Sequence, residues 1–125
     1  MAATLTSLPK ELRSLGLPPA FAGSDKPMYA IAFDMDIESL RSNYGDPYNN
    51  AYLEIRKILQ SHGFNWQQGS VYFGAEQINA VTCVLAAIDL SRQLPWFAPS
   101  VRDIRMLRIE ELNDLMPAVQ QAQQE

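Results

Sequence analysis

The order of two hydrophobic periods along the chain constrains its fold more than any other feature. Residues 28–36 alternate at period two, which is typical of a half-buried strand. Apolar residues then recur every three or four positions over residues 46–63, which predicts a helix. Two short strands (64–66 and 70–73), a second helix (78–94) and a last strand (101–109) complete the pattern. This order predicts an α+β, ferredoxin-like βαββαβ fold: an antiparallel sheet with helices on one face and a short, weaker helical segment from Glu110, interrupted by Pro117.

The two predicted helices have recognisable ends and apolar faces. Asp46 before Pro47 predicts a helix start, because aspartate caps free backbone N–H groups and proline suits the first helical position. Gly63 predicts the end of the same helix. The residues expected to face the sheet are Tyr48, Ala51, Tyr52, Ile55, Ile58 and Leu59 in the first helix, and Ile78, Val81, Val84, Leu85 and Ile88 in the second.

The length favours one domain, because 125 residues can bury a single core and not two. Residues 1–27 hold four of the eight prolines and indicate a mobile leader, so we expect the domain over residues 28–125. We expect no membrane span, because no apolar run approaches the roughly 20 residues that a bilayer requires. Cys83 is the sole cysteine, which excludes an internal disulfide and favours a cytoplasmic protein.

The predicted topology gathers polar side chains at one edge of the sheet. In strand order 4-1-3-2, the end of the first strand lies beside the starts of the third and fourth strands. Asp34, Ser70 and Asp103 are therefore expected near one another, and they are the candidate catalytic residues. The same edge is expected to receive Tyr44, Tyr48, Arg92 and Trp96.

Asp34 is also the candidate metal ligand. Mg²⁺ and Mn²⁺ prefer oxygen ligands, and two copies of Asp34 across a twofold axis would offer opposing carboxylates to one ion. The small side chains of Ala30 and Ala32 predict such a homodimer, with the axis near the paired first strands. Alternatively, Asp34 and Asp36 only end the strand and begin the next turn.

Charge is unevenly distributed along the chain, whose net charge is −4. Residues 92–108 contain four arginines and one acid, whereas residues 109–125 contain four acids and no base. The arginines either solvate a surface strand or form an anion site, in which Arg92 or Arg102 would contact an RNA backbone. Tyr44 and Tyr48 could stack on unpaired bases.

Several separate blocks of the sequence resemble the virulence-associated protein D (VapD) family. They are MYAIAFD (28–34), YGDPY (44–48), Ala51-Tyr52, GFNWQQGSVY (63–72), Trp96-Phe97 and SVRDIR (100–105). The resemblance runs from Met28 to about Met116, and Met28 is similar to the usual family start.

The resemblance implies a ferredoxin-like homodimer similar to the small nuclease-like subunit of CRISPR adaptation systems. It also implies endoribonuclease activity, in some bacteria with toxin–antitoxin behaviour and hence a protein antitoxin as partner. By match to the family's motifs, Asp34, Ser70 and Asp103 are the site residues. Metal dependence, and attack by water or by the ribose 2′-hydroxyl, stay open. The alternatives are a non-catalytic dimer that binds nucleic acid or an antitoxin, and a small-molecule sensor of the same fold.

Overall fold

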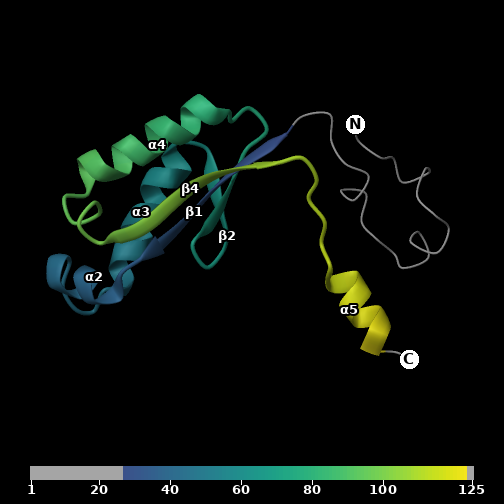
Figure 1. The fold of residues 1–125 in the computed structure, drawn as a ribbon, viewed down its shortest axis with the longest axis horizontal. Coiled ribbons are helices and arrows are strands. Elements are labelled where there is room, and N and C mark those ends of the chain that lie inside the picture. Colours follow the sequence, from purple (N-terminus) through teal and green to yellow (C-terminus); the bar gives the residue numbers. More distant parts are fainter. Residues whose placement is uncertain (1–26, 124–125) are drawn as a thin grey trace. The chain divides into compact units, whose positions relative to one another are not determined.

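The structure is a computed structural model that describes residues 27–123 (Figure 1). Met28–Arg108 form one compact unit, and the chain from Ile109 onward belongs to a second unit, which we describe by itself. The predicted mobile leader spans residues 1–27, and residues 1–26 lie outside the described part of the chain. The elements are β1 (Met28–Met35), α2 (Ile37–Asn43), α3 (Asn49–Ser61), β2 (Phe64–Gln68), β3 (Val71–Gly74), α4 (Ala80–Gln93), β4 (Val101–Ile109) and α5 (Met116–Gln123).

The four strands form one sheet in the order β2-β3-β1-β4, which confirms the predicted ferredoxin-like fold. β1 and β2 both run antiparallel to β3. At the other edge, the backbone N–H of Asp36 donates to the carbonyl of Ser100 at 2.8 Å. This bond joins the end of β1 to the start of β4, so β4 also runs antiparallel to its neighbour.

Period two along β1 separates a core face from an open face. Ile31, Phe33 and Met35 are buried under α3 and α4, which cover one side of the sheet (Figure 1). Ala30 and Ala32 lie on the other side, the open face, opposite Phe73 and Val71 of β3. The expectation of an uncovered alanine face holds only in part, because Ala30 is itself fully buried and Ala32 is half-buried.

The chain between β1 and α3 differs from the prediction. An additional helix, α2, begins after Asp36, whose carboxylate accepts the backbone N–H of Ser39 at 3.1 Å and so caps the helix. The expected helix start at Asp46-Pro47 is wrong: α3 begins at Asn49 after Tyr48, and no side chain caps it. Asp46 faces Arg41 instead, with 3.5 Å between the carboxylate and the guanidinium.

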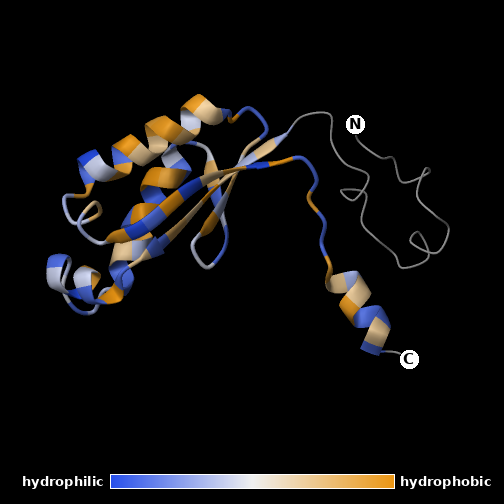
Figure 2. Cartoon of the chain, viewed as in Figure 1, coloured by the Kyte–Doolittle hydropathy of each residue, from blue (hydrophilic) through white to orange (hydrophobic). Residues whose placement is uncertain are grey.

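The prediction for the apolar face of α4 is also largely wrong. Ile78 is buried just before the helix, but the helical residues predicted to face the sheet with it are exposed, namely Val81, Val84, Leu85 and Ile88. Cys83, Ala86 and Leu90 face the core instead. Apolar residues occur all around this helix (Figure 2), so the pattern could not indicate which side packs.

The part of the chain after Ile109 contains α5. The helix begins at Met116, whose backbone N–H donates to Asp114 Oδ1 at 2.9 Å. Pro117 therefore lies in the first turn of α5, so the predicted interruption of the helix at Pro117 is wrong. Backbone N–H groups in the first turn have no acceptor within the helix, so proline is tolerated there. Among the described residues, no helix is both long and apolar enough to span a membrane.

Candidate active site at the end of the first strand

The central feature of the site is an arginine between two carboxylates. Asp34 leaves β1 on the open face, and 62% of its side chain is exposed. Arg102 of β4 places Nη1 3.6 Å from Asp34 Oδ2 and Nη2 3.5 Å from Asp36 Oδ2. The site thus combines a solvent-accessible carboxylate with a guanidinium, a donor suited to phosphate oxygens.

Ser100 fixes the backbone beneath this cluster. Its carbonyl accepts the N–H of Asp36, and its hydroxyl accepts a hydrogen bond from Asn43 Nδ2 at 3.0 Å. The same hydroxyl donates to the carbonyl of Ser39 at 3.4 Å. Because Ser100 is only 1% exposed, water does not compete with these bonds. A single buried serine therefore ties together β1, α2 and β4.

An irregularity in β4 explains how Arg102 reaches Asp34. Val101 and Ile104 both pack against the core, although residues three apart would lie on opposite faces of a regular strand. The alternation is therefore interrupted between them, and Arg102 and Asp103 are both exposed. The carboxylate oxygens of Asp103 accept from Arg105 Nε, each at 3.1 Å, so this aspartate has an arginine partner of its own.

Ser70 lies in the turn between β2 and β3, directly beside β1. Its carbonyl accepts the backbone N–H of Phe33 at 3.1 Å, which places Ser70 next to the residue that precedes Asp34. The structure therefore brings the three candidate catalytic residues to neighbouring strand ends. Arg102 of β4 pairs with Asp34 and directly precedes Asp103 in the chain. Ser70 bonds to Phe33, which directly precedes Asp34.

The aromatic residues that follow β1 form two contacts near this edge. The ring of Tyr44 meets Trp96 edge to face, with 5.0 Å between centroids. Tyr48 lies 6.4 Å from Tyr52 between ring centroids, and the guanidinium of Arg41 lies 5.2 Å from the centre of the Tyr48 ring. Both predicted stacking residues thus already contact another side chain.

Tyr52 packs against the core, as predicted, and also lies close to the site. Burial, then the nearby Tyr48, then the negative charge of Asp34 raise the pKa of Tyr52. The hydroxyl of Tyr52 therefore lies within the electrostatic reach of Asp34. The spacing of four between Tyr48 and Tyr52 was the available signal, because it places both rings on one face of α3.

Arg92 is the predicted site residue with the weakest connection to this cluster. It lies in the last turn of α4 and interacts electrostatically with Asp89, one turn earlier on the same helix. Within the part of the chain that the structure describes, no hydrogen bond or ion pair joins Arg92 to Asp34.

The donor chemistry at the site suits a hard cation, but one chain offers few ligands. The pKa of Asp36 is lowered, first by the backbone N–H of Ser39 and then by Arg102, so this carboxylate is committed to structural partners. No group of three His, Cys, Asp or Glu residues within 27–123 is arranged to hold a metal ion. Asp34, exposed and held by one guanidinium, is the carboxylate with room for an ion or a substrate.

Comparison with known proteins agrees with this fold. The family model for CRISPR associated protein Cas2 matches residues 27–115. The protein named endoribonuclease VapD 2 from Riemerella anatipestifer is 53% identical over 93 residues, which are 74% of this chain and 99% of that protein. An endoribonuclease VapD homolog from Helicobacter pylori is 55% identical over 92 residues, covering 74% of this chain and 96% of its own.

The similarity extends to further members. Endoribonuclease VapD from Dichelobacter nodosus is 47% identical over 95 residues, which are 76% of this chain and all of that protein. These matches confirm the resemblance of this chain to the VapD family. The chain therefore belongs to the VapD family and carries a domain of the CRISPR associated protein Cas2 family.

Proposed function

We propose that this protein is an endoribonuclease that cleaves phosphodiester bonds in RNA at the site around Asp34. The observation that carries the proposal is the exposed Asp34 carboxylate, held beside Arg102 on a backbone that Ser100 fixes. The relatives named endoribonuclease VapD align over nearly their whole length, which adds support. A preorganised carboxylate next to a guanidinium can orient an attacking oxygen while the cation balances charge on the phosphate.

In this proposal each predicted site residue has a distinct role. Asp34 orients the attacking oxygen or holds a divalent ion, Ser70 positions a phosphate, and Asp103 orients or relays a proton. Arg102 and Arg92 contact the RNA backbone, and bases stack on Tyr44 and Tyr48. Attack by the ribose 2′-hydroxyl leaves a cyclic phosphate on the product and attack by water does not, so product analysis distinguishes the two.

The cofactor of this proposal is Mg²⁺ or Mn²⁺ bound by Asp34. Since one chain supplies a single exposed carboxylate with room for an ion here, we propose a homodimer whose twofold axis lies near β1 and adds the partner's Asp34. The half-buried Ala32 on the open face supports close approach of a second sheet. Such an ion would stabilise charge that builds on the scissile phosphate.

For the cellular role, we propose a cytoplasmic toxin of a toxin–antitoxin pair, with a protein antitoxin as a further partner. The support is the membership of the VapD family together with the single cysteine, Cys83, which suits a reducing compartment. A toxin should arrest growth when this chain is expressed alone, and co-expression of an adjacent open reading frame that encodes its antitoxin should restore growth. This test is separate from the test of cleavage.

The decisive experiment compares purified wild type, Asp34→Asn and Asp46→Asn on labelled RNA, with magnesium, manganese or chelator. Asp46 is an equally exposed carboxylate paired with Arg41, so it is a matched control outside the site. We expect wild type and Asp46→Asn to cleave and Asp34→Asn to be inactive. Equal cleavage by all three proteins would contradict the assignment, and loss of cleavage with chelator would support the ion.

A second function, binding without catalysis, is favoured by one observation. Asp34 and Asp103 each form an ion pair with an arginine. In this alternative the aspartates only hold the two guanidinium groups in place, and the guanidinium groups bind an anion. This alternative predicts that RNA or an antitoxin binds tightly, without turnover, in every divalent metal tested.

A further inference from the structure

Trp66 is an exposed aromatic side chain on the edge strand β2. It is 46% exposed, although it lies opposite Tyr72 of β3, which is buried. The guanidinium of Arg56 in α3 lies 4.4 Å from the centre of the indole ring and covers one side of it. The indole Nε1 donates to the carbonyl of Gly69 at 2.9 Å. The ring is thus held at its edge and from one side, and the rest of it is open to a ligand.

The surroundings of this ring favour a ligand with negative charge. Residues 55–75 contain two basic residues, Arg56 and Lys57, and no aspartate or glutamate. Among the described residues, no carboxylate pairs with Arg56, and its Nε atom has no hydrogen-bond partner. Because the net charge of the whole chain is −4, this segment is a positive region in an acidic protein. A chain that carries both negative charge and flat rings fits these two properties, and single-stranded nucleic acid is such a chain.

The ring lies within reach of the proposed catalytic carboxylate. Trp66 pairs with Tyr72, and Tyr72 pairs with Ile31, three residues before Asp34 on β1. Two strand spacings of about 4.8 Å and three residues of about 3.4 Å place the Cα atoms of Trp66 and Asp34 about 14 Å apart. The turn that holds the indole continues directly to Ser70, which is hydrogen-bonded to β1. Since Asp34 lies on the open face and Trp66 faces α3, a bound strand would join them by passing over this turn.

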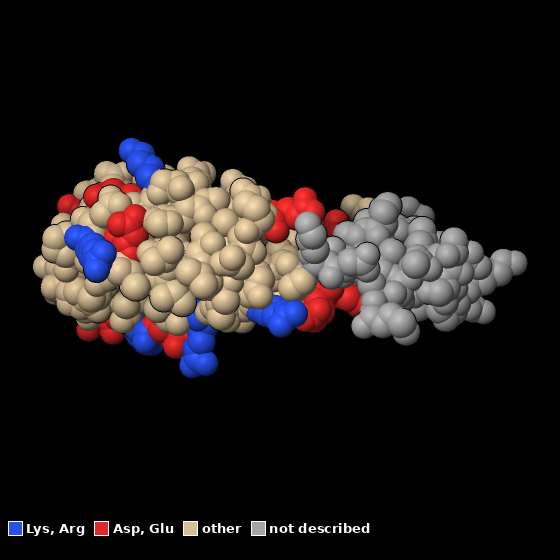
Figure 3. Space-filling model, turned by 90° about the horizontal axis from the view of Figure 1, so that it is seen from above, with Lys and Arg blue, Asp and Glu red and all other residues tan. Residues whose placement is uncertain are grey.

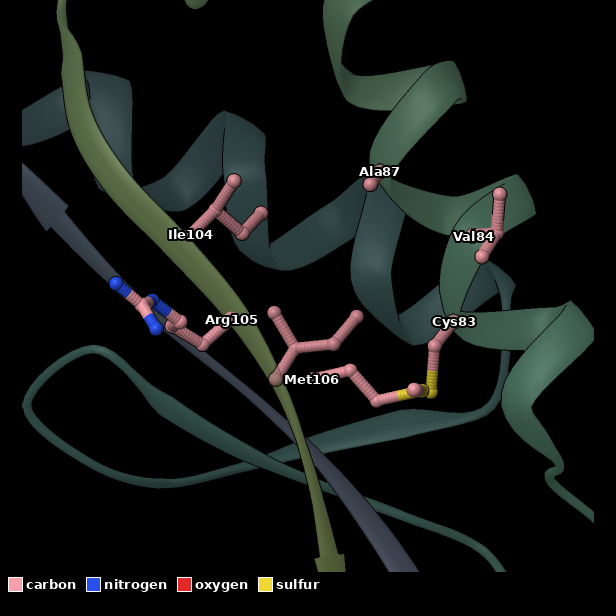
Figure 4. Close-up of a pocket in the computed structure, with 7 residues that line it drawn as sticks. Cys83, Val84, Ala87, Ile104, Arg105 and Met106 are labelled. Atoms are coloured by element: carbon pink, nitrogen blue, oxygen red, sulfur yellow. The ribbon is translucent and has the colours of Figure 1, made fainter.

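Two other surfaces fit a nucleotide less well. Seen from the side of α4, the molecule presents a broad area without charged side chains, which leaves a phosphate without a partner (Figure 3). The groove between α4 and β4 measures about 110 Å³, well below the roughly 300 Å³ at which small-ligand pockets begin. Within it, Met106 reaches toward Cys83, and the guanidinium of Arg105 points away from Cys83 (Figure 4). The groove is therefore both small and mostly apolar.

We propose that Trp66 is a stacking platform for one unpaired base of the RNA and that Arg56 is its positioning residue. The base lies on the open side of the indole, while Arg56 keeps the ring in place from the other side. Stacking of this kind accepts every base, because each base has an aromatic face. The platform therefore orients the strand relative to Asp34 without selecting a sequence. It is additional to Tyr44 and Tyr48, and it rests on the proposed nuclease function.

The test is the affinity for a short labelled RNA, single-stranded or annealed to its complement, measured by fluorescence anisotropy. The parent protein is Asp34→Asn, which prevents cleavage. We expect Trp66→Leu to weaken binding of the single strand about tenfold and to leave duplex binding unchanged, because bases in a duplex are not free to stack on the ring. Trp66→Phe keeps an aromatic face and should bind the single strand more tightly than Trp66→Leu. Leu85→Ala changes a side chain on α4 that is 54% exposed, and this matched control should bind as the parent does.

Two further measurements identify the contact as stacking on a ring that Arg56 positions. Stacking neutralises no phosphate, so Trp66→Leu should keep the salt dependence of the parent. Arg56→Gln should also weaken binding, and Arg56→Gln combined with Trp66→Leu should bind no more weakly than Trp66→Leu alone, because Arg56 acts through the ring. The proposal is overturned if Trp66→Leu binds the single strand as tightly as the parent, or if Trp66→Phe binds no better than Trp66→Leu. Circular dichroism confirms that each variant is folded.

Cleavage assays in the Asp34 background of the wild type separate this proposal from the nuclease function. Trp66→Leu should raise the KM for single-stranded RNA and change kcat little, because the platform holds the strand and does not touch the reacting atoms. Equal cleavage by wild type and Asp34→Asn would contradict the nuclease assignment, whereas the binding result for Trp66 would still stand. Cleavage that requires Asp34, together with unchanged binding by Trp66→Leu, would contradict the platform alone.

Discussion

Among single residues, Tyr52 carries a hydroxyl that is suited to hydrogen-bond donation near the site. Burial, then Tyr48, then the negative charge of Asp34 raise its pKa, and its ring meets Tyr48 edge to face. A neutral hydroxyl that donates a hydrogen bond can stabilise an oxyanion that forms as a phosphodiester bond breaks. Tyr44 differs, because a hydrogen bond with Glu54 already raises its pKa and occupies its hydroxyl.

We predict that Tyr52→Phe lowers the rate of RNA cleavage about tenfold, the loss expected for one hydrogen bond of about 1.4 kcal/mol. The ring stays in place, so the melting temperature should change little. Single-turnover cleavage by Tyr29→Phe, at the far end of β1, is the control and should match wild type. Equal rates for all three proteins would exclude a role for the Tyr52 hydroxyl.

The sequence predicted that Asp34, Ser70 and Asp103 lie near one another, because strand order places them at neighbouring strand ends. It did not predict the pairing of Asp34 with Arg102 or the bonds of Ser100. The pairing depends on the interrupted alternation of β4 between Val101 and Ile104, and the bonds of Ser100 depend on Ser39 and Asn43 of the unpredicted helix α2. Neither feature follows from the hydrophobic pattern.

Between elements, a polar link joins the two helices that cover the sheet. His62, at the carboxyl end of α3, lies 2.8 Å from Asp89 of α4, measured from Nε2 to Oδ2. Hydrogen bonds from Gln93 and then from His62 lower the pKa of Asp89. His62 thus links two helices from its place at the carboxyl end of α3.

This link makes the stability of the helix layer sensitive to acid. A carboxyl whose pKa is lower folded than unfolded stabilises the protein above its ordinary pKa of 3.8, and this stabilisation is lost as the pH falls through the folded value. We predict that Asp89→Asn has a lower urea midpoint than wild type at about pH 5, and that the difference shrinks below about pH 4. A difference that stays constant over this range would contradict the link.

The apolar face of α3 makes a second prediction at this scale. Leu59 is fully buried on that face, whereas Leu53 is 49% exposed on the same helix. Leu59→Ala should lower the free energy of unfolding by about 2 to 5 kcal/mol, because it leaves a cavity in the core. Leu53→Ala should change it by less than about 0.5 kcal/mol, and urea denaturation measures both.

The contrast between α3 and α4 shows where periodicity is informative. In α3 polar residues alternate with apolar ones, and the predicted residues Ala51, Ile55, Ile58 and Leu59 are buried. In α4 apolar residues occur on every side, so only packing decides which side faces the sheet. Helix α2 was missed because its cap, Asp36, also ends the strand before it.

For the whole molecule, charge limits how RNA can bind. The net charge of −4 opposes general attraction to a polyanion, so binding must come from a local group of cations. Arg102 and Arg105 are both exposed on β4 and belong to the block of residues 92–108 that is rich in arginine. Their carboxylate partners, Asp34 and Asp103, would release them as phosphates approach, which couples RNA binding to exposure of the proposed catalytic carboxylate.

This coupling sets the expected dependence on salt. Arg92, Arg102 and Arg105 of each protomer give about six phosphate contacts in the proposed homodimer, and hence a slope of about −4 for the logarithm of the binding constant against the logarithm of salt concentration. Arg105→Ala removes two of these contacts from the homodimer and should reduce the magnitude of the slope by about 1.4, measured by fluorescence anisotropy with Asp34→Asn protein to prevent cleavage. An unchanged slope would place the RNA on another surface, because a cation that contacts phosphate must release counterions when it binds.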